Sequence, residues 1–168
     1  MHTVMGQGTA AKIRQMLEHM FDFSENFELG GRTFSLYGKY FRRNSRYFAV
    51  KKVEIYAFSN FEHIFLHKAE GHFSLGDFDS VIEHLKEHLD DIVNPNHEHM
   101  SSVITLIVEC DSLDEELIKK IRKFKYRKSY KFGFWGWADM KVMVIDRSAG
   151  KAFENKLAQG DAERLKLV

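Results

Sequence analysis

The sequence predicts an α/β (α+β) fold in which helices pack on a mixed β-sheet. Three observations carry this prediction. Apolar residues recur with helical spacing between residues 9 and 20. Strand patterning follows the glycine pair at 30–31, and from residue 74 helical and strand patterns alternate. We therefore expect one domain over residues 1–168, with the element order α-β-β-β-α-β-α-β-β and, as an alternative, one further short strand at the end.

The first part of the chain is predicted to hold one helix and an antiparallel meander. Ile13 and Leu17 lie on the apolar face of the helix. Three segments rich in aromatic and β-branched residues follow, separated by short polar turns, at 32–41, 47–58 and 61–69. This spacing is typical of consecutive antiparallel strands, so the sheet should open with a meander.

The middle of the chain carries a helix with clear start and stop signals. Ser74 followed by Asp77 has the spacing of a capping box, and Asn94-Pro95 ends the helix. The segment VITLIV, residues 103–108, is apolar almost throughout. Such a run predicts an interior strand that is buried on both faces.

The last part is predicted to hold one more helix and further strands. Ser112 and Glu115 repeat the capping spacing before the helix. Strands are expected at 129–134, 139–146 and 151–155. We expect residues 1–8 and 158–168 to be loosely ordered, the latter with a short helix as the alternative.

Composition limits the class of protein. Hydrophobic residues make up 44% of the chain, as in a globular protein, but no apolar run approaches the ~20 residues that a membrane span needs, so we expect no membrane partner. Cys110 is the only cysteine, which excludes an intrachain disulfide. A chain of this kind suits the reducing cytoplasm, where we expect the protein to be located.

Charge is strongly segregated although the net charge is only +1. Residues 31–53 hold seven Lys or Arg and residues 119–131 hold eight, and neither segment contains an acid. Both interleave cations with Tyr and Phe, the chemistry that binds phosphates and stacks on unpaired bases. The sequence therefore predicts an anionic partner, either nucleic acid or an acidic protein.

We assign candidate contacts within these two segments. Phosphate contacts are expected from Arg42, Arg43, Arg46, Lys123, Lys125, Arg127 and Lys128. Stacking contacts are expected from Tyr40, Tyr126 and Tyr130. Two alternatives stay open: the cations could pair with the acidic helix at 77–91, or opposite charge patches could pair between the subunits of a homo-oligomer.

The string FGFWGW, residues 132–137, allows two interpretations. Glycines between large aromatics are typical of core packing at a bend. An exposed Trp135 or Trp137 would instead be an anchor for a partner.

The pentapeptide HLKEH, residues 84–88, resembles the H-x-x-E-H signature of the inverzincin metallopeptidases. The resemblance implies that His84 and His88 bind zinc, with Glu163 as a possible third ligand. The helix periodicity places both histidines between the apolar and the solvated face, so a solvated helix flank is the alternative. We predict no cofactor, and a divalent metal would bind at this pair.

The element order over residues 9–109 resembles the core of the restriction-endonuclease-like PD-(D/E)xK nuclease superfamily. The resemblance implies a metal-dependent nuclease with an Asp near the second core strand and Glu-x-Lys on the third. The chain has no Asp between Phe23 and Gly76, and Glu62-His63-Ile64 lacks the lysine. A binding module is therefore favoured over an enzyme, with a divergent nuclease or a small metallohydrolase as the alternative.

Overall fold

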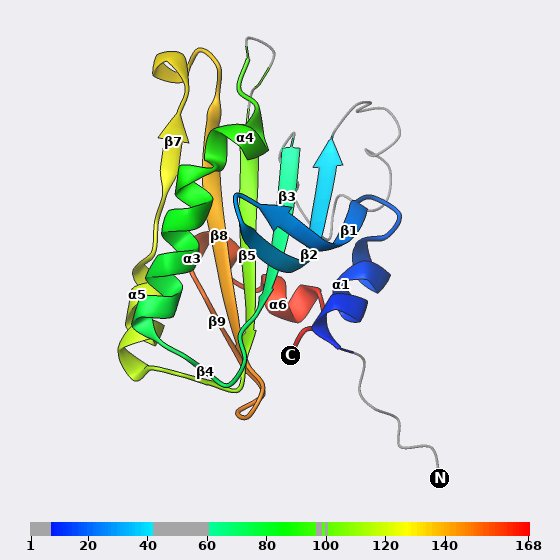
Figure 1. The fold of residues 1–168 in the computed structure, drawn as a ribbon, viewed down its shortest axis with the longest axis vertical. Coiled ribbons are helices and arrows are strands. Elements are labelled where there is room, and N and C mark those ends of the chain that lie inside the picture. The colour runs from blue at the N-terminus through cyan, green and yellow to red at the C-terminus, as the bar shows by residue number, and fades with distance from the viewer. Residues whose placement is uncertain (1–7, 42–60, 97–98, 100) are drawn as a thin grey trace.

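The computed structural model describes residues 8–41, 61–96, 99 and 101–168, and it shows a mixed β-sheet with helices on both faces (Figure 1). The strand order is β1-β2-β3-β5-β8-β7, and β9 also pairs with β8. The strands are β1 (Asp22–Leu29), β2 (Arg32–Phe41), β3 (Phe61–Lys68), β5 (Ser101–Cys110), β7 (Arg127–Ser129), β8 (Trp137–Asp146) and β9 (Lys151–Glu154). A separate parallel pair joins β4 (His72–Phe73) to β6 (Ser112–Leu113). The predicted α/β class with a mixed sheet is confirmed.

The sheet combines antiparallel and parallel pairing. β1, β2 and β3 form an antiparallel meander, whereas β3, β5 and β8 run parallel to one another. β7 and β9 are both antiparallel to β8 and pair with opposite ends of it. The parallel strands are linked through helices, as parallel pairing requires.

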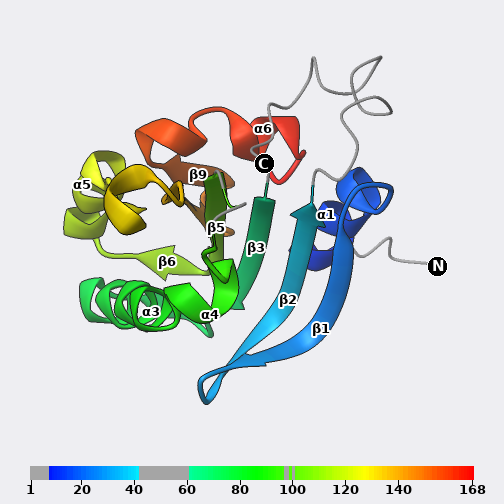
Figure 2. The ribbon, with the colours of Figure 1, turned by 90° about the horizontal axis from the view of Figure 1, so that it is seen from above.

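Two hydrophobic cores lie on the two faces of this sheet (Figure 2). The helices α3 (Leu75–Glu87), α4 (Leu89–Val93) and α5 (Glu115–Lys123) cover one face, and α1 (Thr9–Leu17) and α6 (Asp161–Arg164) cover the other. Phe65 and Leu85 belong to the first core, and Leu36 and Ile107 belong to the second. Alternation of side chains along β5 divides them between the two cores and explains its near-continuous apolar sequence.

Several local predictions are confirmed. Ser74 caps α3: its hydroxyl accepts from the Asp77 backbone nitrogen at 3.1 Å, and the Asp77 carboxylate accepts from the Ser74 nitrogen at 3.0 Å. Asn94 ends α4 in the left-handed conformation, with φ 50°. β5 is buried along almost its whole length, as VITLIV indicated.

Other local predictions need correction. β1 was not predicted, because most of its side chains are exposed and give no apolar alternation; Gly30-Gly31 is the turn between β1 and β2. Ser112 lies in β6 and the residue that precedes α5 is Asp114. The predicted strand at 129–134 is wrong beyond its first residue: β7 ends at Ser129, and a 3-10 turn, Lys131–Gly133, follows.

The C-terminal segment packs rather than remaining loose. A 3-10 turn, Lys156–Ala158, precedes α6, and Leu165 and Leu167 are buried in the second core. The predicted strand at 47–58 and residues 1–7 lie outside the described residues. Within the described part of the chain, no helix is both long enough and apolar enough to cross a membrane.

Candidate functional site

The outer edge of β8 has a gap between its two antiparallel partners. β7 pairs with residues 137–139 of β8 and β9 pairs with residues 143–146. The buried amide of Asn155 fills the gap: its Nδ2 donates to the Met140 carbonyl at 3.0 Å, and its Oδ1 accepts from the Val142 nitrogen at 3.0 Å. One side chain thus supplies the backbone bonds that a strand would otherwise make.

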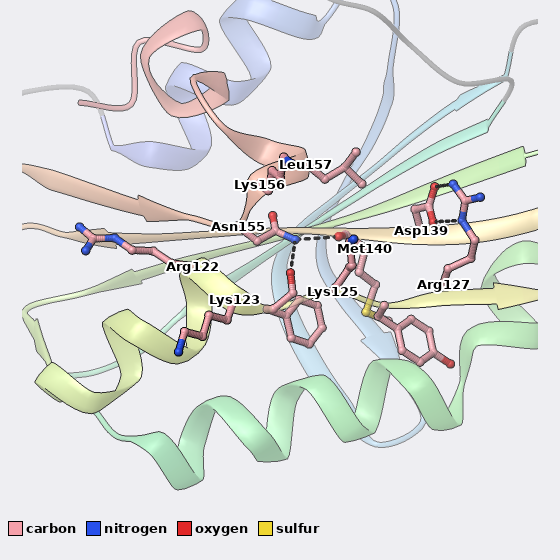
Figure 3. Close-up of a pocket in the computed structure, with 11 residues that line it drawn as sticks. Arg122, Lys123, Lys125, Arg127, Asp139, Met140, Asn155, Lys156 and Leu157 are labelled. Atoms are coloured by element: carbon pink, nitrogen blue, oxygen red, sulfur yellow. Dashed lines mark hydrogen bonds and ion pairs between the residues drawn. The ribbon is translucent and has the colours of Figure 1, made fainter.

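A pocket of about 890 Å³ lies over this gap (Figure 3). Its lining comes from the end of α5 and the segment leading to β7, from β8, and from the residues after β9. Phe124, Tyr126, Met140 and Leu157 supply its apolar and aromatic lining. Its polar side chains include five cations: Arg122, Lys123, Lys125, Arg127 and Lys156. We call the pocket, with all the residues that line it, the basic pocket.

The basic pocket carries excess positive charge because only one of its cations is neutralised. Arg127 makes two hydrogen bonds to Asp139, at 2.6 and 2.8 Å, and these bonds raise the pKa of the guanidinium. Among the described residues, no carboxylate lies within ion-pair distance of the other four cations. Unpaired cations around a concave surface create a local potential that attracts anions.

Part of the basic segment does pair with the acidic helix, as the alternative interpretation expected. Lys120 bonds to Asp79 of α3, and the Lys128 ammonium lies 2.9 Å from a carboxylate oxygen of Asp90 in α4. These two pairs attach the segment to α3 and α4 on one side. They leave Arg122, Lys123, Lys125 and Lys156 of the basic pocket without a carboxylate partner among the described residues.

Four of the predicted contact residues meet in the basic pocket, namely Lys123, Lys125, Tyr126 and Arg127. Tyr126 is half-buried, and the Lys86 ammonium lies 4.8 Å from the centre of its ring. Lys128 lies outside the pocket lining and is paired with Asp90. The predicted contacts Arg42, Arg43 and Arg46 lie outside the described residues.

Two predicted stacking residues are in the interior instead. Tyr40 is 4% exposed and packs on Phe21, with ring centres 5.6 Å apart. Tyr130 is 6% exposed, and burial raises the pKa of its phenol. Neither ring can stack on a bound base. An alternation of aromatic and basic residues does not reveal which aromatic side chains face inward.

Several residues of the basic pocket were not predicted. Asp139, Asn155, Lys156 and Leu157 lie 12 to 30 residues beyond Arg127 in the sequence and reach the site only through the pairing of β8 with β7 and β9. Lys156 and Leu157 form part of the 3-10 turn before α6. No local sequence signal connects them with the basic segment.

The histidine pair of HLKEH is used in packing. His84 donates from Nε2 to the Leu29 carbonyl at 2.5 Å, and the two imidazole rings lie edge to face, 4.4 Å apart. His88 packs against Gly30, where an added Cβ would lie 1.8 Å from its Nε2. Glu163, the suggested third zinc ligand, belongs to α6 on the opposite face of the sheet.

Acids of the nuclease-like region do not form a metal site in the described part of the chain. Glu62 is 1% exposed on β3, and Glu109 on β5 accepts from Arg147 at 2.7 Å. No group of three or more His, Cys, Asp or Glu side chains is placed to hold a metal ion among these residues. Burial raises the pKa of Cys110 to about 11, which keeps its thiol protonated.

Comparison with known proteins gives a family but no described relative. No curated protein and no solved structure matches the chain. One family model, described as a domain of unknown function (DUF8052), matches residues 7–167. This match spans nearly the whole of the chain, including every element of the basic pocket, so the chain belongs to the DUF8052 family.

Proposed function

We propose that the protein is a non-catalytic binding module that engages nucleic acid through the basic pocket. The observation that carries the proposal is the set of four cations, Arg122, Lys123, Lys125 and Lys156, that surround apolar side chains and have no carboxylate partner in the described residues. Phosphates would replace the missing carboxylates, and release of their counterions would drive binding.

The geometry favours a chain of phosphates over a single small anion. The four unpaired cations come from two segments distant in sequence: Arg122, Lys123 and Lys125 from α5 and its extension, and Lys156 from the turn after β9. They are therefore spread around the pocket. Apolar and aromatic side chains lie between them, where they can contact sugar or base. An acidic protein segment is the alternative anion, and a competition experiment separates the two.

The test is fluorescence anisotropy with labelled oligonucleotides over a series of salt concentrations. We expect the affinity to fall steeply as salt rises. The variant Lys123→Glu/Lys125→Glu should lose at least about tenfold in affinity, because both cations would become repulsive. The matched control, Lys12→Glu/Lys68→Glu, changes net charge equally at two lysines outside the pocket lining and should bind as the native protein does. If both variants lost the same affinity, the effect would come from net charge alone, and the basic pocket would be refuted as the binding site.

The same samples test the alternatives. Cleavage of the oligonucleotide on addition of Mg²⁺ would support the divergent nuclease, and zinc that depends on His84 and His88 would support the metallohydrolase. A homo-oligomer held by charge patches would dissociate at high salt in size-exclusion chromatography. We place the binding activity in the cytoplasm, which the free buried thiol of Cys110 supports.

A further inference from the structure

The loop between β7 and β8 exposes two phenylalanines completely. Phe132 is 101% and Phe134 is 85% exposed. Six large hydrophobic side chains are exposed in the described part of the chain, and four of them, Phe132, Phe134, Trp137 and Leu157, belong to this loop, to β8 beside it or to the basic pocket. Apolar exposure is therefore concentrated along one edge of the sheet, as it is at interaction sites.

The loop holds these rings outward in a fixed conformation. Lys131 and Phe132 adopt left-handed backbone conformations, with φ 48° and 56°, which are unfavourable for a bulky side chain. The Tyr130 nitrogen donates to the Gly136 carbonyl at 2.9 Å, and the Trp135 nitrogen donates to the Tyr130 carbonyl at 3.1 Å. The strained turn is thus closed by its own hydrogen bonds.

The base of the loop is also attached to the interior. Buried His99 donates from Nδ1 to the Trp135 carbonyl at 2.6 Å, and its Nε2 accepts from the Ser102 hydroxyl at 2.8 Å. Tyr130 packs beneath the loop against the edge of His99, with ring centres 5.9 Å apart. A rigid loop loses little conformational entropy when its exposed rings are bound, which favours a binding role.

Cations connect the loop to the basic pocket. The Arg127 guanidinium, which lines the pocket, lies 5.0 Å from the centre of the Trp137 ring, and the Lys131 ammonium lies 5.1 Å from the centre of Trp135. Residues 119–138 contain no Asp or Glu. A polyanion in the pocket can therefore continue towards the loop without meeting a negative side chain of this segment.

We propose that Phe132 and Phe134 stack on unpaired bases, so that the protein selects single-stranded nucleic acid over duplex. This inference rests on the proposed function, with phosphates in the basic pocket. Every base offers an aromatic face, but in a duplex these faces are covered by the neighbouring base pairs. Projecting rings on a rigid turn suit bases that are free to open around them, whereas a folded protein partner would have to provide a matching cavity.

The experiment compares one labelled DNA strand of about 20 nucleotides with the duplex of the same sequence. We expect the native protein to bind the single strand more tightly. Phe132→Ala/Phe134→Ala should weaken single-strand binding about tenfold or more, since stacking on one aromatic ring contributes that much, and should leave duplex binding unchanged. Because both rings are exposed, the variant should fold normally, and its thermal unfolding checks this.

Two further variants sharpen the result. Phe132→Leu/Phe134→Leu keeps an apolar surface without aromatic rings and should also lose single-strand preference; full retention would overturn stacking. Met16→Ala removes an exposed apolar side chain on α1, far from the loop in sequence, and should have no effect.

The outcomes separate the two proposals. If neither DNA binds, the proposed function fails together with this inference. If single strand and duplex bind equally and the phenylalanine variants change nothing, the proposed function stands and this inference fails. Binding to vesicles that contain anionic phospholipid is measured with the same variants. If the phenylalanine variants lose binding to these vesicles and keep their binding to DNA, the loop contacts a membrane surface and base stacking is refuted.

Discussion

The two ends of the sheet differ in whether their polar side chains have partners within the protein. At the end formed by β1, β2 and β3, the polar aromatic side chains bond within the protein: the Tyr37 hydroxyl and Nδ1 of His63 share a hydrogen bond of 2.7 Å, and His84 donates to the Leu29 carbonyl. At the β7–β8 edge, four cations of the basic pocket have no carboxylate partner among the described residues, and Phe132 and Phe134 are exposed. The difference shows that unused bonding capacity, more than residue type, marks the candidate site.

The histidine motif and the basic segment differ in the same way. The histidines of HLKEH face the turn at Gly30, and packing uses them. The lysines of the basic pocket have long side chains at an edge where neither β7 nor β9 covers β8.

The largest effect is expected when the pH is lowered, and it should arise at the end of the sheet formed by β1, β2 and β3. Burial, then Lys39 and His99, lowers the pKa of His63 from 6.5 to about 4. Between these values the unfolded chain binds a proton that the folded chain does not, so stability falls as pH drops from 6.5 towards 4. The total loss should be roughly 3 kcal/mol, measured by urea unfolding at successive pH values.

The double variant Tyr37→Phe/His63→Phe provides the control. It removes the titrating ring together with its hydrogen-bond partner, so no buried hydroxyl is left unpaired. Its stability should depend less on pH over the same interval. An unchanged slope would mean that His63 is not the group responsible.

An intermediate effect is expected at the contact between Gly30 and His88, the residue between α3 and α4. Gly30→Ala places a Cβ 1.8 Å from His88 Nε2 and requires a side chain at φ +54°, so it should lower the free energy of unfolding by about 2 kcal/mol. Gly31→Ala, also at positive φ but with nothing within 4 Å, reports the backbone cost alone and should be milder. If urea denaturation showed that both variants lose the same free energy of unfolding, the His88 side chain would have to move aside without cost. Neither change should alter oligonucleotide binding.

The smallest effect is expected at the open edge, from removal of the one acid in the basic pocket. Asp139→Asn releases Arg127 and adds one positive charge, which should raise oligonucleotide affinity severalfold at low salt. The control is Asp79→Asn, which releases Lys120 outside the pocket lining and should change affinity less. A weaker complex with Asp139→Asn would show that the carboxylate positions Arg127 rather than competing with the ligand.

Some features of the fold could be predicted because their signals lie within a few neighbouring residues. The capping box at Ser74 depends on residues three positions apart, and the burial of β5 follows from its own composition. The strand β1 gave no such signal because its side chains are mostly exposed. The packed tail escaped prediction since Leu165 and Leu167 become apolar contacts only when the second core is assembled.

The α/β class, the buried central strand and the concentration of positive charge in residues 119–131 could all be predicted from the order of the amino acids. Which of those cations are neutralised by Asp79, Asp90 and Asp139, and which stay unpaired, depends on the folded arrangement. It also brought Lys156 and Leu157 to the basic pocket and buried Tyr40 and Tyr130. Charge density is a property of neighbouring residues along the chain, whereas pairing and burial depend on strands and helices that are distant in sequence.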